Sequence, residues 1–200
     1  MTGAVGAERL DQAAGLILAA GASIRFGTDK LAAQLRGRPV LQHVLDAAAD
    51  AALHPIVVVI ARQRAEVDWR GARPVINPQP GSGLSSSVRV GLEALADERV
   101  STVVVLLGDQ PLVSPDTIRR LLAEPRDDAH PIIVPRYADG RAGNPVIVDR
   151  TAWVLASGLS GDRGMSQLFA ARPDLVRYVS VLGVNPDVDT PADLAALDRA

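Results

Sequence analysis

Two uninterrupted apolar runs constrain the fold of this chain more than any other feature of its sequence. Ile56–Ala61 reads IVVVIA, and Thr102–Leu107 reads TVVVLL. Both runs have the length of a strand and consist mainly of branched residues, which favour strands. An apolar pattern that is continuous rather than alternating is typical of strands buried on both faces of a parallel sheet. The chain is therefore expected to build a sheet with helices on both sides.

Helical patterns alternate with these and other short apolar runs. Apolar side chains recur every three or four positions at 40–48 and 84–97, and Ser114-Pro115 begins another helix that is expected to end near Glu124. The other expected strands are 16–20, 74–77, 132–134, 145–148 and 175–181, and the other expected helices are 151–156, 164–171 and 193–199. This alternation predicts an α/β fold with a mostly parallel sheet, in which the pair 132–134 and 145–148 allows one antiparallel strand. We expect one domain at 14–200 after a flexible leader at 1–13.

The overall composition excludes several classes of protein. Aromatic residues are only 3% of the chain and the net charge is -2, so the sequence lacks the stacking residues and the basic surface of a nucleic-acid-binding protein. The absence of cysteine removes disulfides, thiolate metal sites and cysteine nucleophiles. The N-terminal residues have no apolar segment of a signal peptide, and no apolar run approaches membrane-spanning length. We expect a cytoplasmic protein without nucleic-acid or membrane partners.

The loop Gly21–Lys30 has the composition of a phosphate-binding loop. Gly21 and Gly27 allow the backbone to turn tightly and approach a ligand, and backbone N–H groups in such a loop can converge on anionic oxygens. Arg25 and Lys30 add two positive charges. Lys30 is the only lysine among 21 basic residues, and a compact ammonium is not equivalent to a guanidinium in a tight pocket. The loop predicts a triphosphate site; a lysine kept by chance on a surface loop is the alternative.

Three further loops are expected at the same carboxyl edge of the sheet, where ligands of open α/β folds bind. Asp109 follows the strand 102–107 and suits Mg²⁺, with a turn aspartate before a helix as the alternative. At 79–87 (QPGSGLSSS), glycines and serines surround a helix start. This pattern fits contacts to a base, ribose or phosphate, and it fits helix capping alone equally well. Under both interpretations one serine is expected to cap the helix. Asp187 and Asp189 precede the last helix, where capping explains at least one of them and a second metal ligand is the alternative.

Other site patterns fit the sequence less well. The loop Gly21–Lys30 matches neither the Walker A pattern nor the G-x-G-x-x-G fingerprint of dinucleotide-binding proteins. Arg62 and Arg64 follow the second strand and could imitate a site for the 2′-phosphate of a nicotinamide cofactor, but without the glycine spacing a small dehydrogenase is the weaker interpretation. The histidines lie outside these loops and form no recognisable Ser-His-Asp arrangement; they are His43, His54 and His130.

Several motifs in a fixed order resemble one known family. LAAGASIRFGTDK, NPQPGSGLSSSVRVGL and VVVLLGDQP are followed by GNPVIV, GDRG and DVDTPADL. This order is similar to that of the nucleotidyltransferases that include the MobA and MocA proteins of molybdenum-cofactor biosynthesis. The resemblance covers about residues 15–197, and LAAG together with GDQP is closer to the MocA-like cytidylyltransferase branch. It implies a Rossmann-like α/β/α sandwich of the nucleotide-diphospho-sugar transferase type.

The resemblance also implies a reaction and a set of site residues. The implied reaction is transfer of CMP from CTP to molybdenum–molybdopterin, which gives molybdopterin cytosine dinucleotide and pyrophosphate with Mg²⁺ as cofactor; a molybdoenzyme or its maturation factor is an implied partner. The implied residues are Arg25, Lys30 and Asp109 for catalysis; Ala19, Ala20, Gly21, Ala22, Gly83, Ser85, Ser86 and Ser87 for the nucleotide; Gly143, Asn144, Pro145 and Asp162 for the acceptor; and Asp109 and Asp189 for the metal. Asn144 stands where the MocA-like branch commonly has His, which bears on the identity of the acceptor.

Two alternatives to this reaction remain. The first is guanylyl or other NTP transfer to a different phosphorylated acceptor, because the preference for CTP over GTP depends on Ala19 and Ala20. The second is a non-catalytic chaperone that binds molybdenum cofactor. The combination of Arg25, Lys30 and Asp109 favours an enzyme, since a protein that only binds the cofactor does not need a metal carboxylate.

Overall fold

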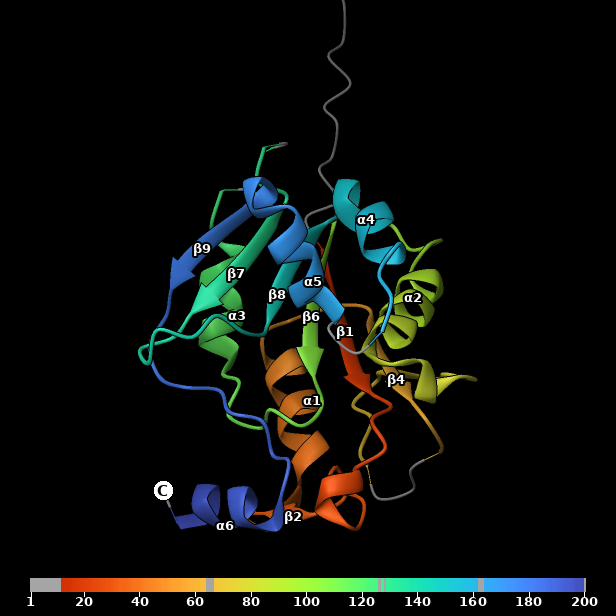
Figure 1. The fold of residues 1–200 in the computed structure, drawn as a ribbon, viewed down its shortest axis with the longest axis vertical. Coiled ribbons are helices and arrows are strands. Elements are labelled where there is room, and N and C mark those ends of the chain that lie inside the picture. Colours follow the sequence, from red (N-terminus) through yellow and green to blue (C-terminus); the bar gives the residue numbers. More distant parts are fainter. Residues whose placement is uncertain (1–11, 64–66, 126, 128, 162–163, 200) are drawn as a thin grey trace, which may run out of the picture.

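The computed structural model of the chain describes residues 12–63, 67–125, 127, 129–161 and 164–199, and Figure 1 shows its fold. Seven strands in this part of the chain form one sheet in the order β5-β4-β1-β6-β8-β7-β9. They are β1 Ala13–Ala19, β4 Ile56–Ile60, β5 Arg73–Ile76, β6 Thr102–Leu107, β7 Ile132–Arg136, β8 Val146–Asp149 and β9 Val176–Ser180. β8 is antiparallel to β6 and β7, and the other neighbours are parallel. The prediction of a mostly parallel sheet is confirmed.

Helices cover both faces of this sheet. α1 Val40–Asp50 and α3 Pro115–Leu122 contribute to one buried apolar cluster, whereas α2 Leu84–Ala94, α4 Trp153–Ser157 and α5 Gly164–Ala171 contribute to the other. Because side chains alternate along a strand, β1 supplies Ile17 to the first cluster and Leu16 and Leu18 to the second. The molecule therefore has three layers, as an α/β/α sandwich requires.

The remaining elements are short or peripheral. β2 Gln34–Leu35 and β3 Arg38–Pro39 form an antiparallel pair, and α6 Pro191–Arg199 lies near it, where Asp198 Oδ1 accepts a hydrogen bond from the backbone N–H of Arg36 at 2.9 Å. The single-turn 3₁₀ helices are Ile24–Phe26, Pro80–Ser82, Arg150–Ala152 and Pro173–Leu175.

α2 packs closely against β1 at a glycine. A Cβ atom on Gly91 would lie 2.2 Å from Cδ1 of the fully buried Leu16, so a side chain there would require this close-packed leucine to shift. This close approach fixes α2, and with it the loop that precedes the helix, relative to the end of β1.

The element boundaries differ little from the expected ones. α2 and α3 end at Ala94 and Leu122, two or three residues earlier than predicted, because the chain turns there with hydrogen bonds such as that from Ala96 N to Glu93 O. Ser114 is the predicted cap of α3, since its Oγ accepts from Thr117 N at 3.0 Å. Most of the predicted leader, residues 1–11, lies outside the described residues, and Ala13 already pairs with Thr102 in the sheet.

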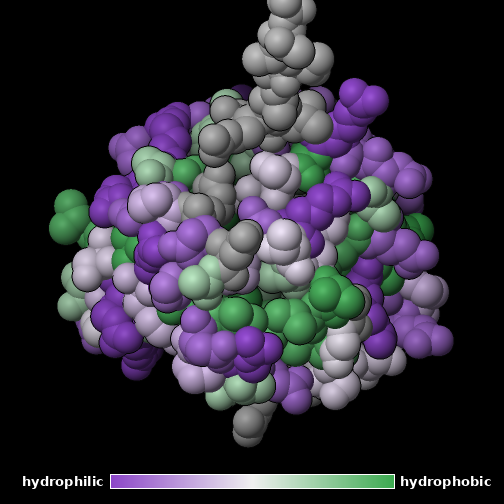
Figure 2. All heavy atoms as spheres, turned by 90° about the horizontal axis from the view of Figure 1, so that it is seen from above, coloured by the Kyte–Doolittle hydropathy of each residue, from purple (hydrophilic) through white to green (hydrophobic). Residues whose placement is uncertain are grey.

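The surface mixes polar and apolar side chains. Figure 2 shows one face, on which a hydrophobic area is bordered by hydrophilic residues. Among the described residues, no helix combines the length and the apolar character that a membrane span needs.

Candidate active site

The predicted loops meet at the carboxyl edge of the sheet because their strands are neighbours. β1 leads into the loop that contains Lys30, and the adjacent β6 leads into Gly108-Asp109-Gln110. Gly108 N donates to Leu18 O at 2.9 Å, which holds the second loop against the end of β1. The segment between β9 and α6 joins them, since Val188 N donates to Asp109 O at 2.9 Å and the Val188 side chain is fully buried.

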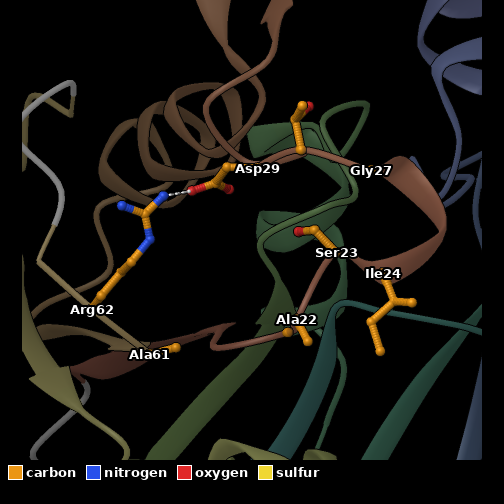
Figure 3. A pocket seen from close by; sticks show the side chains of 9 residues that line it. Ala22, Ser23, Ile24, Gly27, Asp29, Ala61 and Arg62 are labelled. Atoms are coloured by element: carbon orange, nitrogen blue, oxygen red, sulfur yellow. Dashed lines mark hydrogen bonds and ion pairs between the residues drawn. The ribbon is translucent and has the colours of Figure 1, made fainter.

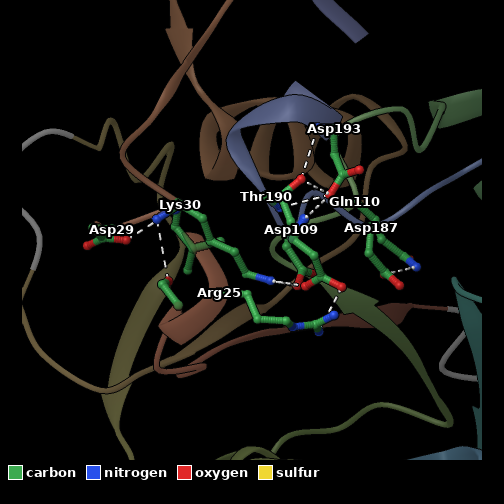
Figure 4. Close-up of polar contacts among 11 residues, drawn as sticks. Arg25, Asp29, Lys30, Asp109, Gln110, Asp187, Thr190 and Asp193 are labelled. Carbon is green, nitrogen blue, oxygen red and sulfur yellow. Dashed lines mark hydrogen bonds and ion pairs between the residues drawn. The ribbon is translucent and has the colours of Figure 1, made fainter. Parts of the chain in front are cut away.

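Lys30 is the centre of a charge cluster formed by these three segments. Its Nζ donates to Oδ2 of Asp109 at 2.6 Å and to Oδ1 of Asp189 at 2.9 Å. Arg25 contacts the other oxygen of Asp189 at 2.8 Å. In Figure 4 the side chains of Arg25, Lys30 and Asp109 point toward one another. The structure thus brings together all the residues predicted to act on phosphate and metal, and those roles stay predictions.

Burial and charge act in opposite directions on Lys30. Burial disfavours its ammonium, but attraction and hydrogen bonds from Asp109 and Asp189 outweigh this cost and raise the pKa of Lys30 above its ordinary value. Nearby, partial burial and the charge of Asp109 raise the pKa of the Asp187 carboxyl, although a hydrogen bond from Gln110 opposes the shift. Because its pKa is raised, Lys30 is a cation at neutral pH.

The carboxylates of Asp109 and Asp189 fit a hard divalent cation. Their oxygens lie close enough for one ammonium to contact both, and carboxylate oxygens suit Mg²⁺, which often takes one or two of them and completes its shell with phosphate oxygens and water. In the part of the chain that the structure describes, no cluster of three or more His, Asp or Glu residues is arranged to hold a metal ion. A metal held by these two carboxylates would take its remaining ligands from phosphate oxygens and water.

The serines at the start of α2 do not cap the helix, and the expectation that one of them does so is wrong. Gly83 is the N-cap residue and no side chain accepts a capping hydrogen bond there. All three serines are buried, and Asn77 Nδ2 donates to Ser86 Oγ at 2.8 Å and to Ser87 Oγ at 3.0 Å. The hydroxyl of Ser85 has no hydrogen-bond partner among the described residues. Two serines thus hold the loop 77–87, and their proposed contact with the nucleotide stays a prediction.

α6 is capped by Thr190 and Asp193, so the expectation that Asp187 or Asp189 caps it is wrong. Thr190 Oγ1 accepts from Asp193 N at 3.2 Å, and Asp193 Oδ2 accepts from the backbone N–H groups of Thr190 at 2.8 Å and Asp189 at 3.1 Å. Figure 4 shows this cap. Because Thr190 and Asp193 form the cap, the Asp189 carboxylate is left for Lys30 and Arg25.

The rest of the first loop borders a cleft of about 330 Å³, whose lining residues are shown in Figure 3. Gly21 and Ala22 are exposed there, whereas Ala19 and Ala20 are buried. Arg62 contacts Asp29 Oδ2 at 2.6 Å, so this arginine helps to hold the loop. Arg64 lies outside the described residues.

Two of the four predicted acceptor residues border a second, more apolar cleft of about 520 Å³. Gly143 and Asn144 line it together with apolar side chains such as Met165 and Phe169. Pro145 follows a cis peptide bond after Asn144. Asp162 lies outside the described residues, and the preceding Gly161 accepts from Ser85 N at 3.2 Å.

Some residues of the site were not singled out from the sequence. Gln110 is buried between Asp187 and Asn185, with which it forms hydrogen bonds, and Asn77 organises the serine loop. The available signal was their position: Gln110 directly follows Asp109, and Asn77 directly follows β5. The histidines stay apart, as expected; His43, for example, pairs with the Leu35 carbonyl.

The family of the chain follows from comparison with known proteins. The model of the MobA-like NTP transferase domain matches residues 15–176. The chain belongs to this family. Its Lys30, Asp109 and serine loop all lie within the matched residues. The recognition from sequence motifs is confirmed.

Curated proteins that are similar to this chain have various names. GlmU of Bordetella petrii is 39% identical over 54% of this chain and 25% of its own length, so the chain spans about a quarter of that bifunctional protein. The purine catabolism protein PucB of Bacillus subtilis is 27% identical over 93% of this chain and 96% of its own. A probable molybdenum cofactor guanylyltransferase of Natranaerobius thermophilus is 28% identical over 62% and 60%.

Solved structures confirm the fold. Rv0371c of Mycobacterium tuberculosis superimposes with a TM-score of 0.82 at 34% identity and covers 94% of this chain and 98% of its own. A second structure of Rv0371c, described as a complex with manganese, has a TM-score of 0.79 at 32% identity, with coverage of 94% and 99%.

Proposed function

We propose that this member of the family transfers CMP from CTP to molybdenum–molybdopterin and releases pyrophosphate, with Mg²⁺ as the metal. The observation that carries this proposal is the contact of Lys30 with both Asp109 and Asp189, beside Arg25. Two cations and two carboxylates in one cluster match the needs of a metal–triphosphate complex, in which the cations face phosphate and the carboxylates face metal.

In this proposal the side chains act by position and charge. Arg25 and Lys30 hold the triphosphate and stabilise the charge that develops on the leaving pyrophosphate, while the backbone of Gly21 and Ala22 approaches its oxygens. Asp109 and Asp189 hold Mg²⁺, which neutralises phosphate oxygens when bound. A phosphate oxygen of the acceptor attacks the α-phosphorus in line, so no covalent intermediate with the chain is needed.

The remaining assignments follow the roles that the resemblance to the family implies. The nucleotide is assigned to the side of β1 and the loop 79–87, with Gly83 and the serine-held turn near the base and ribose. The acceptor is assigned to the side of Gly143 and Asn144, whose cleft is lined by larger apolar side chains. The loop that contains Asp162 is proposed to border the acceptor as well.

A second candidate is transfer of GMP from GTP. It is favoured by the relative named as a probable molybdenum cofactor guanylyltransferase. Transfer to a different phosphorylated acceptor is a further variant of the same chemistry. It is considered because Asn144, which stands where the MocA-like branch commonly has His, lines the acceptor cleft.

A nucleotide panel tests these possibilities. Thermal denaturation is measured with CTP, GTP, ATP and UTP in the presence of Mg²⁺, and pyrophosphate release is measured with molybdenum–molybdopterin. A nucleotide at 100 times its dissociation constant stabilises the fold by about 2.7 kcal/mol, so we expect CTP to give the largest shift and the fastest release. If GTP ranks first, the chain is a guanylyltransferase. Nucleotide binding without pyrophosphate release supports the non-catalytic chaperone. If no nucleotide binds, the proposed nucleotide transfer is contradicted.

A further inference from the structure

A series of hydrogen bonds through Gln110 joins the metal-side loops to the acceptor loop. Gln110 is 7% exposed, and its Nε2 donates to Asp187 Oδ1 at 2.8 Å. Its Oε1 accepts from Asn185 Nδ2 at 3.1 Å, and the same Nδ2 donates to the Asn144 carbonyl at 3.1 Å. Both halves of the Gln110 amide are therefore used, which fixes its orientation.

The series ends on a side chain that is held just as firmly. The hydroxyl of Tyr137 donates to the same Asn144 carbonyl at 2.6 Å, and Tyr137 is 8% exposed. The Asn144 carbonyl thus accepts two hydrogen bonds, one from a residue that precedes it in the sequence and one from a residue that follows it. Leaving a buried polar group unpaired costs free energy, so breaking one bond in the series weakens the others.

This series forms the wall between two clefts. Gln110, Gly143 and Asp187 line both the apolar cleft of about 520 Å³ and a more polar one of about 730 Å³. The polar cleft also contains Arg25 and Asp189 of the charge cluster. A group bound in the apolar cleft therefore lies against the same residues that border the charged site.

We propose that Gln110 is a positioning residue for the acceptor substrate, an inference that rests on the proposed function. Gln110 follows Asp109 directly, so its side chain sets the acceptor loop at a fixed distance from the metal carboxylate. An apolar side chain of the same length fills the space but cannot orient Asp187 or Asn185. The acceptor loop would then be less ordered and would bind the acceptor less tightly, while the loop at Lys30, which shares no hydrogen bond with Gln110 among the described residues, holds the nucleotide as before.

The test compares Gln110→Met, Asn185→Ala and the double variant with the wild type, using CTP, molybdenum–molybdopterin and Mg²⁺. We expect each single variant to raise KM for molybdenum–molybdopterin about tenfold, the effect of one lost buried hydrogen bond, while KM for CTP changes less than twofold. KM for the acceptor in the double variant should be no higher than in the more impaired single variant, because the effects of substitutions within one network are not additive. Gln12→Met is the matched control: it is exposed and precedes β1, at the opposite end of the strand.

Hydrogen exchange provides a readout that does not need activity. In Gln110→Met, the amides of 142–144 and 185–188 should exchange faster than in the wild type, and those of 21–30 should not. An unchanged KM for the acceptor, an equal rise of both KM values or additive effects in the double variant would each overturn the inference. A wild-type chain that releases no pyrophosphate with any nucleotide would instead remove the proposed function, and this inference with it.

Discussion

The ammonium Nζ of Lys30 lies 2.6 Å from Oδ2 of Asp109, although 79 positions separate the two residues in the chain. Only 11% of the Lys30 side chain and 22% of the Asp109 side chain are exposed. The pair is thus shielded from solvent and salt more than a surface ion pair, and its geometry is set by the adjacent strands β1 and β6. The only lysine of the chain is committed to the carboxylates assigned to the metal.

The first prediction concerns the chemistry of this lysine. Lys30→Ala should lower the rate of pyrophosphate release about 10²–10³-fold, because a charge aimed at the developing pyrophosphate is lost. Lys30→Arg should restore little of the rate, since a planar guanidinium does not fit a site built around one compact ammonium. Steady-state release with CTP and Mg²⁺ checks both variants, and their folding is verified by circular dichroism. Near-normal turnover of Lys30→Ala would contradict the proposed role.

The second prediction concerns competition between Lys30 and the metal for the same oxygens. Because the ammonium contacts both Asp109 and Asp189, a metal binding alone must displace it, whereas a triphosphate gives it another anion. Mn²⁺, measured by electron paramagnetic resonance, should bind about tenfold more tightly with a non-hydrolysable CTP analogue than without it, a coupling of typical size. Lys30→Gln should bind Mn²⁺ more tightly than the wild type in the absence of nucleotide. Equal or weaker Mn²⁺ binding by that variant would show that the lysine does not compete.

The sequence predicts the layout of this site better than its contacts. Continuous apolar runs such as 56–61 and 102–107 identify buried parallel strands, and the strand ends then place Lys30 and Asp109 at one edge. The bond between Lys30 and Asp189 depends on the path of a segment 159 positions away, which no local pattern describes. The serine loop shows the same limit: a helix start rich in serine suggests capping, but Asn77 from the end of β5 binds two of the hydroxyls instead.

The third prediction follows from the unequal environments of adjacent serines. Ser86 Oγ accepts from Asn77 and donates to the Gly83 carbonyl at 2.8 Å, so Ser86→Ala should lower the free energy of unfolding by about 1–3 kcal/mol. Ser85 is equally buried, but in the part of the chain that the structure describes its hydroxyl has no hydrogen-bond partner, so Ser85→Ala should change stability by no more than about 0.5 kcal/mol or increase it. Urea denaturation measures both variants. Equal losses would mean that the hydrogen bonds of Ser86 do not account for its effect.

The last prediction concerns alkaline pH and Tyr137. Burial raises the pKa of Tyr137 to about 12 from an ordinary value of 10.0, against a smaller opposing effect of Asn185. The folded state therefore keeps the phenolic proton at pH values where the unfolded chain loses it. The corresponding stability is fully present below pH 10 and is lost as the pH rises toward 12, up to about 2.7 kcal/mol at 1.36 kcal/mol per pKa unit.

Two tyrosine variants separate this effect from other alkaline changes. The chain has two tyrosines, so Tyr178→Phe leaves Tyr137 as the only phenol, and its absorbance near 295 nm should titrate with a midpoint near pH 12. Tyr137→Phe should be less stable at neutral pH, because the bond to the Asn144 carbonyl is lost, but should lose less further stability between pH 10 and 12 than the wild type. A midpoint near pH 10 in Tyr178→Phe, or the same alkaline loss in Tyr137→Phe and the wild type, would show that the phenol is not held in the buried network beside the acceptor loop.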